Sequence, residues 1–140
     1  MLLTIGYERR SAQELISLLQ CAGVSLVADV RERPLSRRPA FSRSRLQEAL
    51  EAHGIAYIHM SALGSPREIR VLAPNVELAA KRYRQQVLSR NDGALRELVG
   101  RAQRVRVCLL CYEREPEECH RSLIAEEVAH RNTRVRVTHL

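Results

Sequence analysis

Two kinds of hydrophobic pattern alternate along the chain. Short apolar runs that suit buried strands occupy residues 2–6, 25–30, 55–60 and 105–110. Residues 134–139 alternate between apolar and polar side chains, which is typical of an edge strand. Apolar residues three or four apart in the intervening segments predict helices over 11–22, 44–53, 76–90, 92–102 and 116–130. Strands and helices are therefore expected to alternate, with two helices between the third and fourth strands.

Capping and terminating residues support these helix boundaries. Gly23 and Gly54 are placed to end the first two helices. The predicted N-terminal caps are Ser11 in a capping box with Glu14, Ser44 in a box with Gln47, Asn75 and Asp92. Pro116 suits the first turn of the last helix, which places Cys119 close to the N-terminus of that helix.

The alternation of strands and helices predicts the fold class. We expect one α/β domain over residues 1–140, built as a three-layer sandwich with a mostly parallel five-stranded sheet and helices on both faces. Ligands of such sheets bind beyond the carboxyl ends of the strands. The chemically interesting residues of this chain follow those ends, so a crevice is expected there.

Hydropathy and the N-terminal residues indicate where in the cell the protein is found. No apolar run approaches the roughly 20 residues that span a bilayer, and the first residues lack the order of a signal peptide. We therefore expect a cytoplasmic protein with no membrane partner. The four cysteines are then expected to be reduced thiols.

The charge balance narrows the class of partner. A net charge of +7 favours an anionic partner, either a small phosphorylated molecule or nucleic acid, although the arginine excess also fits a base-composition bias. Aromatic residues make up only 4% of the chain, which leaves little for stacking on single strands. No glycine-rich nucleotide fingerprint is present, so the cofactor is unknown.

An arginine-rich loop follows the second strand. Asp29 ends that strand, and Arg31 and Arg37 lie in the loop beside Ser36, stiffened by prolines. Guanidinium groups held over a sheet edge suit bidentate binding of phosphate. Alternatively, the arginines pair with nearby acids in a solvated loop, and Asp29 orients an arginine, acts as a base or caps the loop. Tyr7, which follows the first strand, is expected to line the same crevice.

The stretch CLLCYEREPEECHRS, residues 108–122, admits several interpretations. Cys108 and Cys111 have the C-x2-C spacing of zinc sites, and Cys119 and His120 would complete a ligand set. Side chains three apart on a strand point to opposite faces, so no metal site is predicted. Cys119 is a candidate nucleophile near a helix N-terminus, although neighbouring glutamates oppose a thiolate and a packed thiol is the alternative. Glu113 is placed for acid–base chemistry or for a ribose hydroxyl, and otherwise pairs with an arginine.

Four ordered motifs resemble one known family. They are TIGY at 4–7, DVRERPLSRRPAF at 29–41, GIAYIHMSALG at 54–64 and LLCYEREPEECHRSLIAEEVAHR at 109–131. Together they are similar to the domain of unknown function 488 family. The resemblance implies a small α/β domain of bacteria or archaea and leaves the reaction open. Tyr7 and Glu8 stand where that family usually has His-Ser, and Ser65 replaces a glycine.

These observations give a leading hypothesis and two alternatives. In the leading hypothesis, Arg31, Arg37 and Arg121 hold the phosphate of a nucleotide or of a nucleic-acid end, and Cys111 lines the same crevice. The proton-transfer candidates are Glu113 and His120, with Cys119 as the nucleophile. The alternatives are a non-catalytic nucleic-acid-binding module and an adaptor domain without a ligand site. The sequence leaves open whether the protein is an enzyme, and it leaves the oligomeric state open.

Overall fold

Five strands form one sheet in which every pairing is parallel. The computed structural model describes residues 1–140. The strands are β1 (Leu2–Gly6), β2 (Leu26–Asp29), β3 (Ala56–His59), β4 (Val107–Cys111) and β5 (Val137–His139). Their order across the sheet is β3-β2-β4-β1-β5, so β1 and β2 flank β4 and the last strand lies at an edge. The α/β class predicted from the alternation is confirmed.

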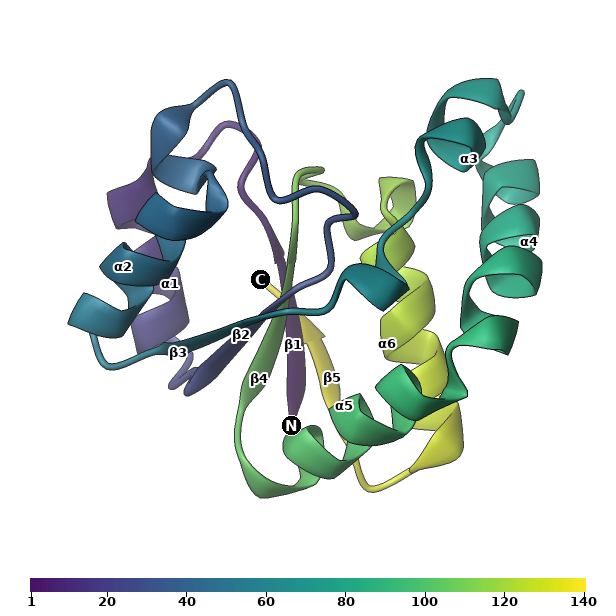
Figure 1. Cartoon of the computed structure of the whole chain (residues 1–140). Coiled ribbons are helices and arrows are strands. Elements are labelled where there is room, and N and C mark those ends of the chain that lie inside the picture. The colour runs from purple at the N-terminus through teal and green to yellow at the C-terminus, as the bar shows by residue number, and fades with distance from the viewer.

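Helices cover both faces of the sheet (Figure 1). On one face lie α1 (Ala12–Cys21) and α2 (Arg43–Ala52). The other face carries α3 (Arg67–Leu72), α4 (Val76–Gln86), α5 (Asp92–Arg104) and α6 (His120–Arg131). The two faces bury separate clusters of 15 and 21 residues, as the three-layer prediction requires. None of these helices combines the length and the apolar character needed to cross a membrane.

Several predicted helix boundaries are confirmed. The Ser11 hydroxyl accepts the Glu14 amide at 3.0 Å, and the Asn75 side chain accepts the Leu78 amide at 2.8 Å. Gly23 and Gly54 follow their helices with φ of +67° and +74°, the left-handed region that glycine enters without strain. Local backbone chemistry therefore sets these ends.

Other boundaries were predicted wrongly. Helix α2 begins at Arg43 with Ser42 as its N-cap, so Ser44 lies inside the helix instead of capping it. Asn91 is the N-cap of α5, which makes Asp92 its first residue. Residues 116–118 form a separate 3-10 turn, and α6 begins only at His120.

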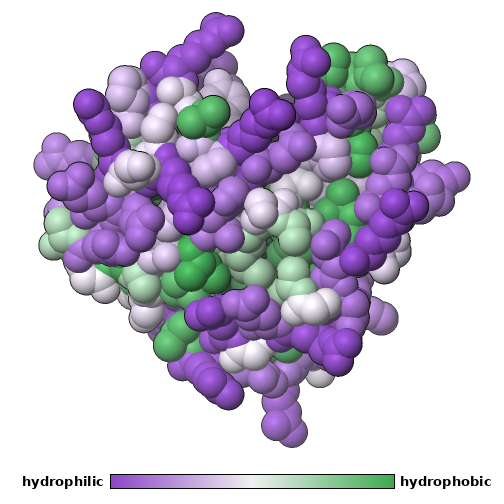
Figure 2. Space-filling model, viewed as in Figure 1, coloured by the Kyte–Doolittle hydropathy of each residue, from purple (hydrophilic) through white to green (hydrophobic).

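The short helix α3 was not predicted at all. Its six residues are too few to show a clear helical spacing of apolar side chains that would mark a buried face. In the structure only Ile69 is buried, whereas Val71 and Leu72 are exposed. Figure 2 shows hydrophobic residues gathered over α3 on a face that is otherwise mostly hydrophilic. This helix matters because it forms one wall of the site.

Candidate functional site at the carboxyl edge of the sheet

Two hollows lie side by side at the edge where β1, β2 and β4 end. The first has a volume of about 460 Å³ and is lined by the loop after β2 together with Tyr7, Cys111 and Glu113; we call it the arginine-lined hollow. The second, of about 340 Å³, lies between α6 and the α3–α4 pair and is called the apolar hollow. The two hollows share four of their lining residues: Ser65, Arg70, Glu113 and His120.

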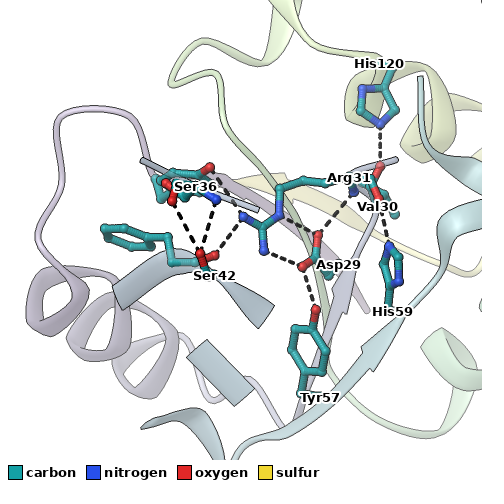
Figure 3. A network of polar contacts seen from close by, with 10 residues as sticks. Asp29, Val30, Arg31, Ser36, Ser42, Tyr57, His59 and His120 are labelled. Carbon is teal, nitrogen blue, oxygen red and sulfur yellow. Dashed lines mark hydrogen bonds and ion pairs between the residues drawn. The ribbon is translucent and has the colours of Figure 1, made fainter. Parts of the chain in front are cut away.

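The floor of the arginine-lined hollow is a buried ion pair. Asp29 is fully buried and accepts from Arg31 Nε at 2.9 Å and from Arg31 Nη2 at 2.6 Å, as Figure 3 shows. The Tyr57 hydroxyl donates to Asp29 Oδ2 at 2.6 Å. Burial and this carboxylate raise the pKa of Tyr57. Arg31 Nη1 donates to the Phe41 carbonyl at 2.8 Å and to the Tyr7 hydroxyl at 3.3 Å.

These contacts assign Asp29 one of the roles left open by its sequence, that of orienting an arginine. Most of the Arg31 N–H groups already have protein partners, and the residue is only 5% exposed. Arg31 therefore ties β2 to the end of its loop, and it lines the hollow as one member of a buried ion pair.

Other arginines of the same loop are free to meet a ligand. Arg33 and Arg37 are exposed and form no hydrogen bond or ion pair through their side chains. Arg38 lies over the Phe41 ring at 4.3 Å and donates to the Tyr7 carbonyl at 3.3 Å. The hollow is lined by five arginines against two glutamates, one of which pairs with Arg70 at 3.6 Å. Its charge is therefore positive.

Ser36 shapes this loop through hydrogen bonds to backbone. Its hydroxyl accepts the Arg38 amide at 3.1 Å, and its own amide donates to the Ser42 hydroxyl at 3.2 Å. The N-cap hydroxyl of α2 is therefore used to fold the loop instead of capping the helix. Ser36 lines the arginine-lined hollow together with Arg37.

Two histidines hold the backbone that follows β2. His59 Nε2 donates to the Arg31 carbonyl at 2.8 Å, and His120 Nε2 donates to the Val30 carbonyl at 2.7 Å (Figure 3). A carbonyl only accepts, so both Nε2 atoms carry a proton. With Nε2 protonated, the Nδ1 atom of neutral His120 has a lone pair. That atom lies 3.9 Å from Cys111 Sγ and 3.8 Å from Cys119 Sγ.

The Cys-His corner is closed to solvent on the sulfur side. Cys119 is the N-cap of α6, and its sulfur accepts the Arg121 amide at 3.5 Å. Burial raises the pKa of Cys119, which keeps the thiol neutral. Burial also lowers the pKa of His120, but its hydrogen bonds to Cys119 and Val30 outweigh that effect and leave the pKa raised. Cys111 donates to Glu113 Oε2 at 3.3 Å.

Arg121 does not reach either hollow. It is fully buried, and its Nε donates to the Thr4 hydroxyl at 3.3 Å. Its two terminal nitrogens donate to the carbonyls of Glu113 and Arg114. The expectation that Arg121 holds a phosphate is therefore corrected, because the guanidinium is used to anchor the segment after β4.

The structure thus brings most of the predicted residues to one place and adds others. Around the arginine-lined hollow lie Tyr7, Arg31, Ser36, Arg37, Cys111, Glu113 and His120, with Cys119 lining the apolar hollow. Asp29 lies beneath them. Sequence reasoning missed Ser65 and Arg70 because the segment after β3 was not recognised as structured. It also left Tyr57 out of the site, although the Tyr57 hydroxyl holds Asp29.

Thiol accessibility gives a direct check of this corner. In reduced, metal-free protein, a chromogenic disulfide reagent should react rapidly with Cys21, which is exposed, and slowly with the three buried cysteines. Denaturant should release the remaining three. A Cys21→Ser variant should then show no rapid phase, and a rapid phase that survives in it would contradict the burial of the other three cysteines.

Comparison with known proteins identifies the family but no activity. The fold and the edge site define a small parallel α/β protein with two adjoining hollows at the strand ends. A profile of the family described as Domain of unknown function DUF488 matches residues 11–128, and the chain belongs to that family. No curated protein matches the chain, and no solved structure matches it either.

Proposed function

We propose that the chain binds a phosphate-bearing ligand of the nucleotide type, either free or as the end of a nucleic acid, across the two hollows. The observation that carries this proposal is their shared wall. One hollow offers an excess of arginine, and the other, in direct continuation, offers apolar and carboxylate groups. A ligand with an anionic end and a flat or partly apolar body matches that division.

The phosphate belongs in the arginine-lined hollow. Arg33 and Arg37 have free guanidinium groups. One guanidinium can donate two parallel hydrogen bonds to two oxygens of a phosphate. Arg31 lines the hollow from below, with its charge balanced by Asp29, so Arg33 and Arg37 supply the charge that a phosphate meets. The body of the ligand then lies along Ile69, Ala79 and Leu123 in the apolar hollow. Three glutamates also line that hollow, and they accept from hydroxyl or amino groups of a nucleoside.

Glu113 is the candidate acid–base group. It lines both hollows, so its carboxylate is close to the place where the two parts of the ligand would join. Apart from Cys111 it has no side-chain partner, which leaves it free to exchange a proton. His120 supports this corner from the wall. The neutral, buried thiol of Cys119 is less suited to nucleophilic attack, because the thiolate is the reactive form.

Ligand binding can be measured by thermal shift and calorimetry. The panel contains nucleoside mono-, di- and triphosphates, sugar phosphates, and an oligonucleotide with and without a terminal phosphate. At least one phosphorylated compound should raise Tm, and Arg37→Ala should weaken its binding about tenfold or more, the effect of losing a charged hydrogen bond. Arg37 is preferable to Arg31 for this test, because Arg31 also supports the fold.

Arg104→Ala is the matched control. Arg104 is exposed at the end of α5, which leads into the amino end of β4 at the opposite edge of the sheet. Its loss removes the same charge and should leave the affinity unchanged. No shift with any compound would refute the proposal. Equal binding of both oligonucleotides, with a steep dependence on salt and no effect of Glu113→Gln, would favour a non-catalytic nucleic-acid-binding module instead.

A further inference from the structure

We propose that Cys111, Cys119 and His120 form a binding site for a thiophilic divalent metal ion of the zinc class. Cys111 ends β4, and the other two residues begin α6. Their three ligand atoms, two sulfurs and one ring nitrogen, lie within 4.8 Å of one another. Two thiolates and an imidazole are a ligand set typical of zinc.

The spacing of these atoms is close to that of ligands around a tetrahedral ion. Zinc–sulfur and zinc–nitrogen bonds of about 2.3 and 2.0–2.1 Å place neighbouring sulfur and nitrogen ligands roughly 3.6 Å apart. His120 Nδ1 lies 3.8 Å from Cys119 Sγ and 3.9 Å from Cys111 Sγ. Both sulfur–nitrogen distances are therefore within a few tenths of an ångström of their coordinated values, and the two sulfurs lie within 4.8 Å of each other.

The histidine is already oriented as a ligand. Its Nε2 proton is donated to the Val30 carbonyl at 2.7 Å, which leaves the Nδ1 lone pair for a metal. A backbone carbonyl on the far nitrogen is the usual outer partner of a metal-bound histidine. The Tyr83 ring packs against the imidazole with centroids 5.2 Å apart, which further restricts its rotation.

Charge and burial also agree with a divalent ion. Cys111 and Cys119 are each only 5% exposed. A coordinated thiol loses its proton, so two thiolates neutralise the charge of one divalent ion and leave no net charge buried. The C-x2-C pattern of the sequence is not the basis of this site. Cys108 belongs to the core on the opposite face of the sheet, as strand geometry predicts, and cannot join Cys111.

The number of protein ligands bears on what the ion would do. Three protein ligands are typical of catalytic zinc sites, whereas structural sites have four. Cys111 and His120 line the arginine-lined hollow, and Cys119 lines the apolar one. The ion would therefore lie in the wall shared by the two hollows, beside the carboxylate of Glu113, with the two thiolates balancing its charge. The metal site itself does not depend on the proposed nucleotide ligand.

Cobalt titration tests the site. The whole chain is stripped with a chelator, reduced, and titrated with Co²⁺, which reports tetrahedral geometry and thiolate ligands through its absorption bands. The expected result is one equivalent of Co²⁺ with a thiolate-to-cobalt band, displaced by Zn²⁺, and a rise of Tm with Zn²⁺ concentration. Cys119→Ser should reduce the band, because Cys111 alone then supplies a thiolate, and should weaken binding at least tenfold, since even loss of an outer partner costs about 10–100-fold.

The choice of variants keeps a folding defect separate from a lost ligand. Serine is a favourable N-cap, so Cys119→Ser keeps the cap of α6 while removing the thiolate. Cys21→Ser, which removes an exposed thiol, should bind Co²⁺ as the parent does. Absence of the thiolate band in the parent, or an undiminished band and affinity in folded Cys119→Ser, would overturn the proposal. Cobalt binding in a protein that ignores every phosphorylated compound would refute the proposed function alone.

Discussion

Replacing Asp29 with alanine should lower the free energy of unfolding by about 3–5 kcal/mol, because the change leaves the Arg31 guanidinium buried without its counter-charge. The pair is bidentate, with N–O distances of 2.9 and 2.6 Å, and Tyr57 donates to the same carboxylate at 2.6 Å. Chemical denaturation monitored by circular dichroism measures the loss.

An exposed ion pair in the same chain is the matched control. Arg84 Nη2 and Glu126 Oε2 are 2.7 Å apart, with side chains 52% and 64% exposed. Solvent screens such a pair, so Glu126→Ala should cost at most about 1 kcal/mol. Similar losses in Asp29→Ala and Glu126→Ala would show that burial does not set the cost, contrary to the expectation.

A double variant separates two effects on the free energy of unfolding: the cost of leaving one charge unpaired and the net contribution of the ion pair. Replacing Asp29 with leucine and Arg31 with methionine removes both charges and fills similar volumes. A buried ion pair gains little over well-packed apolar residues. The double variant should therefore be more stable than Asp29→Ala, although the loop would lose the donor to the Phe41 carbonyl.

The sequence predicts the scaffold well because local chemistry determines it. Buried strands are marked by continuous apolar runs, and the left-handed turns at Gly23 and Gly54 are marked by glycine itself. Where several residues compete for a cap, the pattern is ambiguous. Ser42 and Ser44 are equally good N-cap types, and only the tertiary fold shows that helix α2 begins at Arg43.

The site is less predictable because it depends on which long side chains find partners. Arg31, Arg37 and Arg121 look alike in the sequence, yet two of them are buried and only Arg37 is free. Arg121 donates to the carbonyls of Glu113 and Arg114 and to the Thr4 hydroxyl, and these partners surround it only in the folded protein, where β1 and β4 are paired. The wall formed by α3 leaves no clear periodic signal in six residues.

The same limit applies to the cysteines. Side chains alternate between the two faces of a strand, so residues three apart point to opposite faces. The sequence therefore correctly places Cys108 and Cys111 of β4 in different cores. The approach of Cys111 to Cys119 and His120 depends instead on where α6 begins. Because that helix starts after the 3-10 turn, Cys119 caps it and its sulfur faces back toward the strand end.

Gly6→Ala should destabilise the protein by about 3 kcal/mol and also disturb the site. A Cβ atom at Gly6 would lie 1.7 Å from the Glu113 carbonyl oxygen, so the backbone after β4 must move. That backbone is held by the Tyr7 amide on the Cys111 carbonyl at 3.2 Å and the Glu8 amide on the Tyr112 carbonyl at 2.9 Å. Denaturation measures the loss of stability.

Gly100→Ala is the control for Gly6→Ala. It shows the effect of replacing a glycine that no neighbouring backbone approaches closely. Gly100 lies within α5, and a Cβ there meets nothing within 4 Å, so the change should raise stability by about 0.5–1 kcal/mol through helix propensity. The two variants should therefore shift stability in opposite directions. Gly6→Ala should in addition weaken binding of Co²⁺ and of any phosphorylated ligand, because Cys111 and Glu113 move with the displaced backbone. Unchanged binding in Gly6→Ala would mean that the end of β4 does not position these groups.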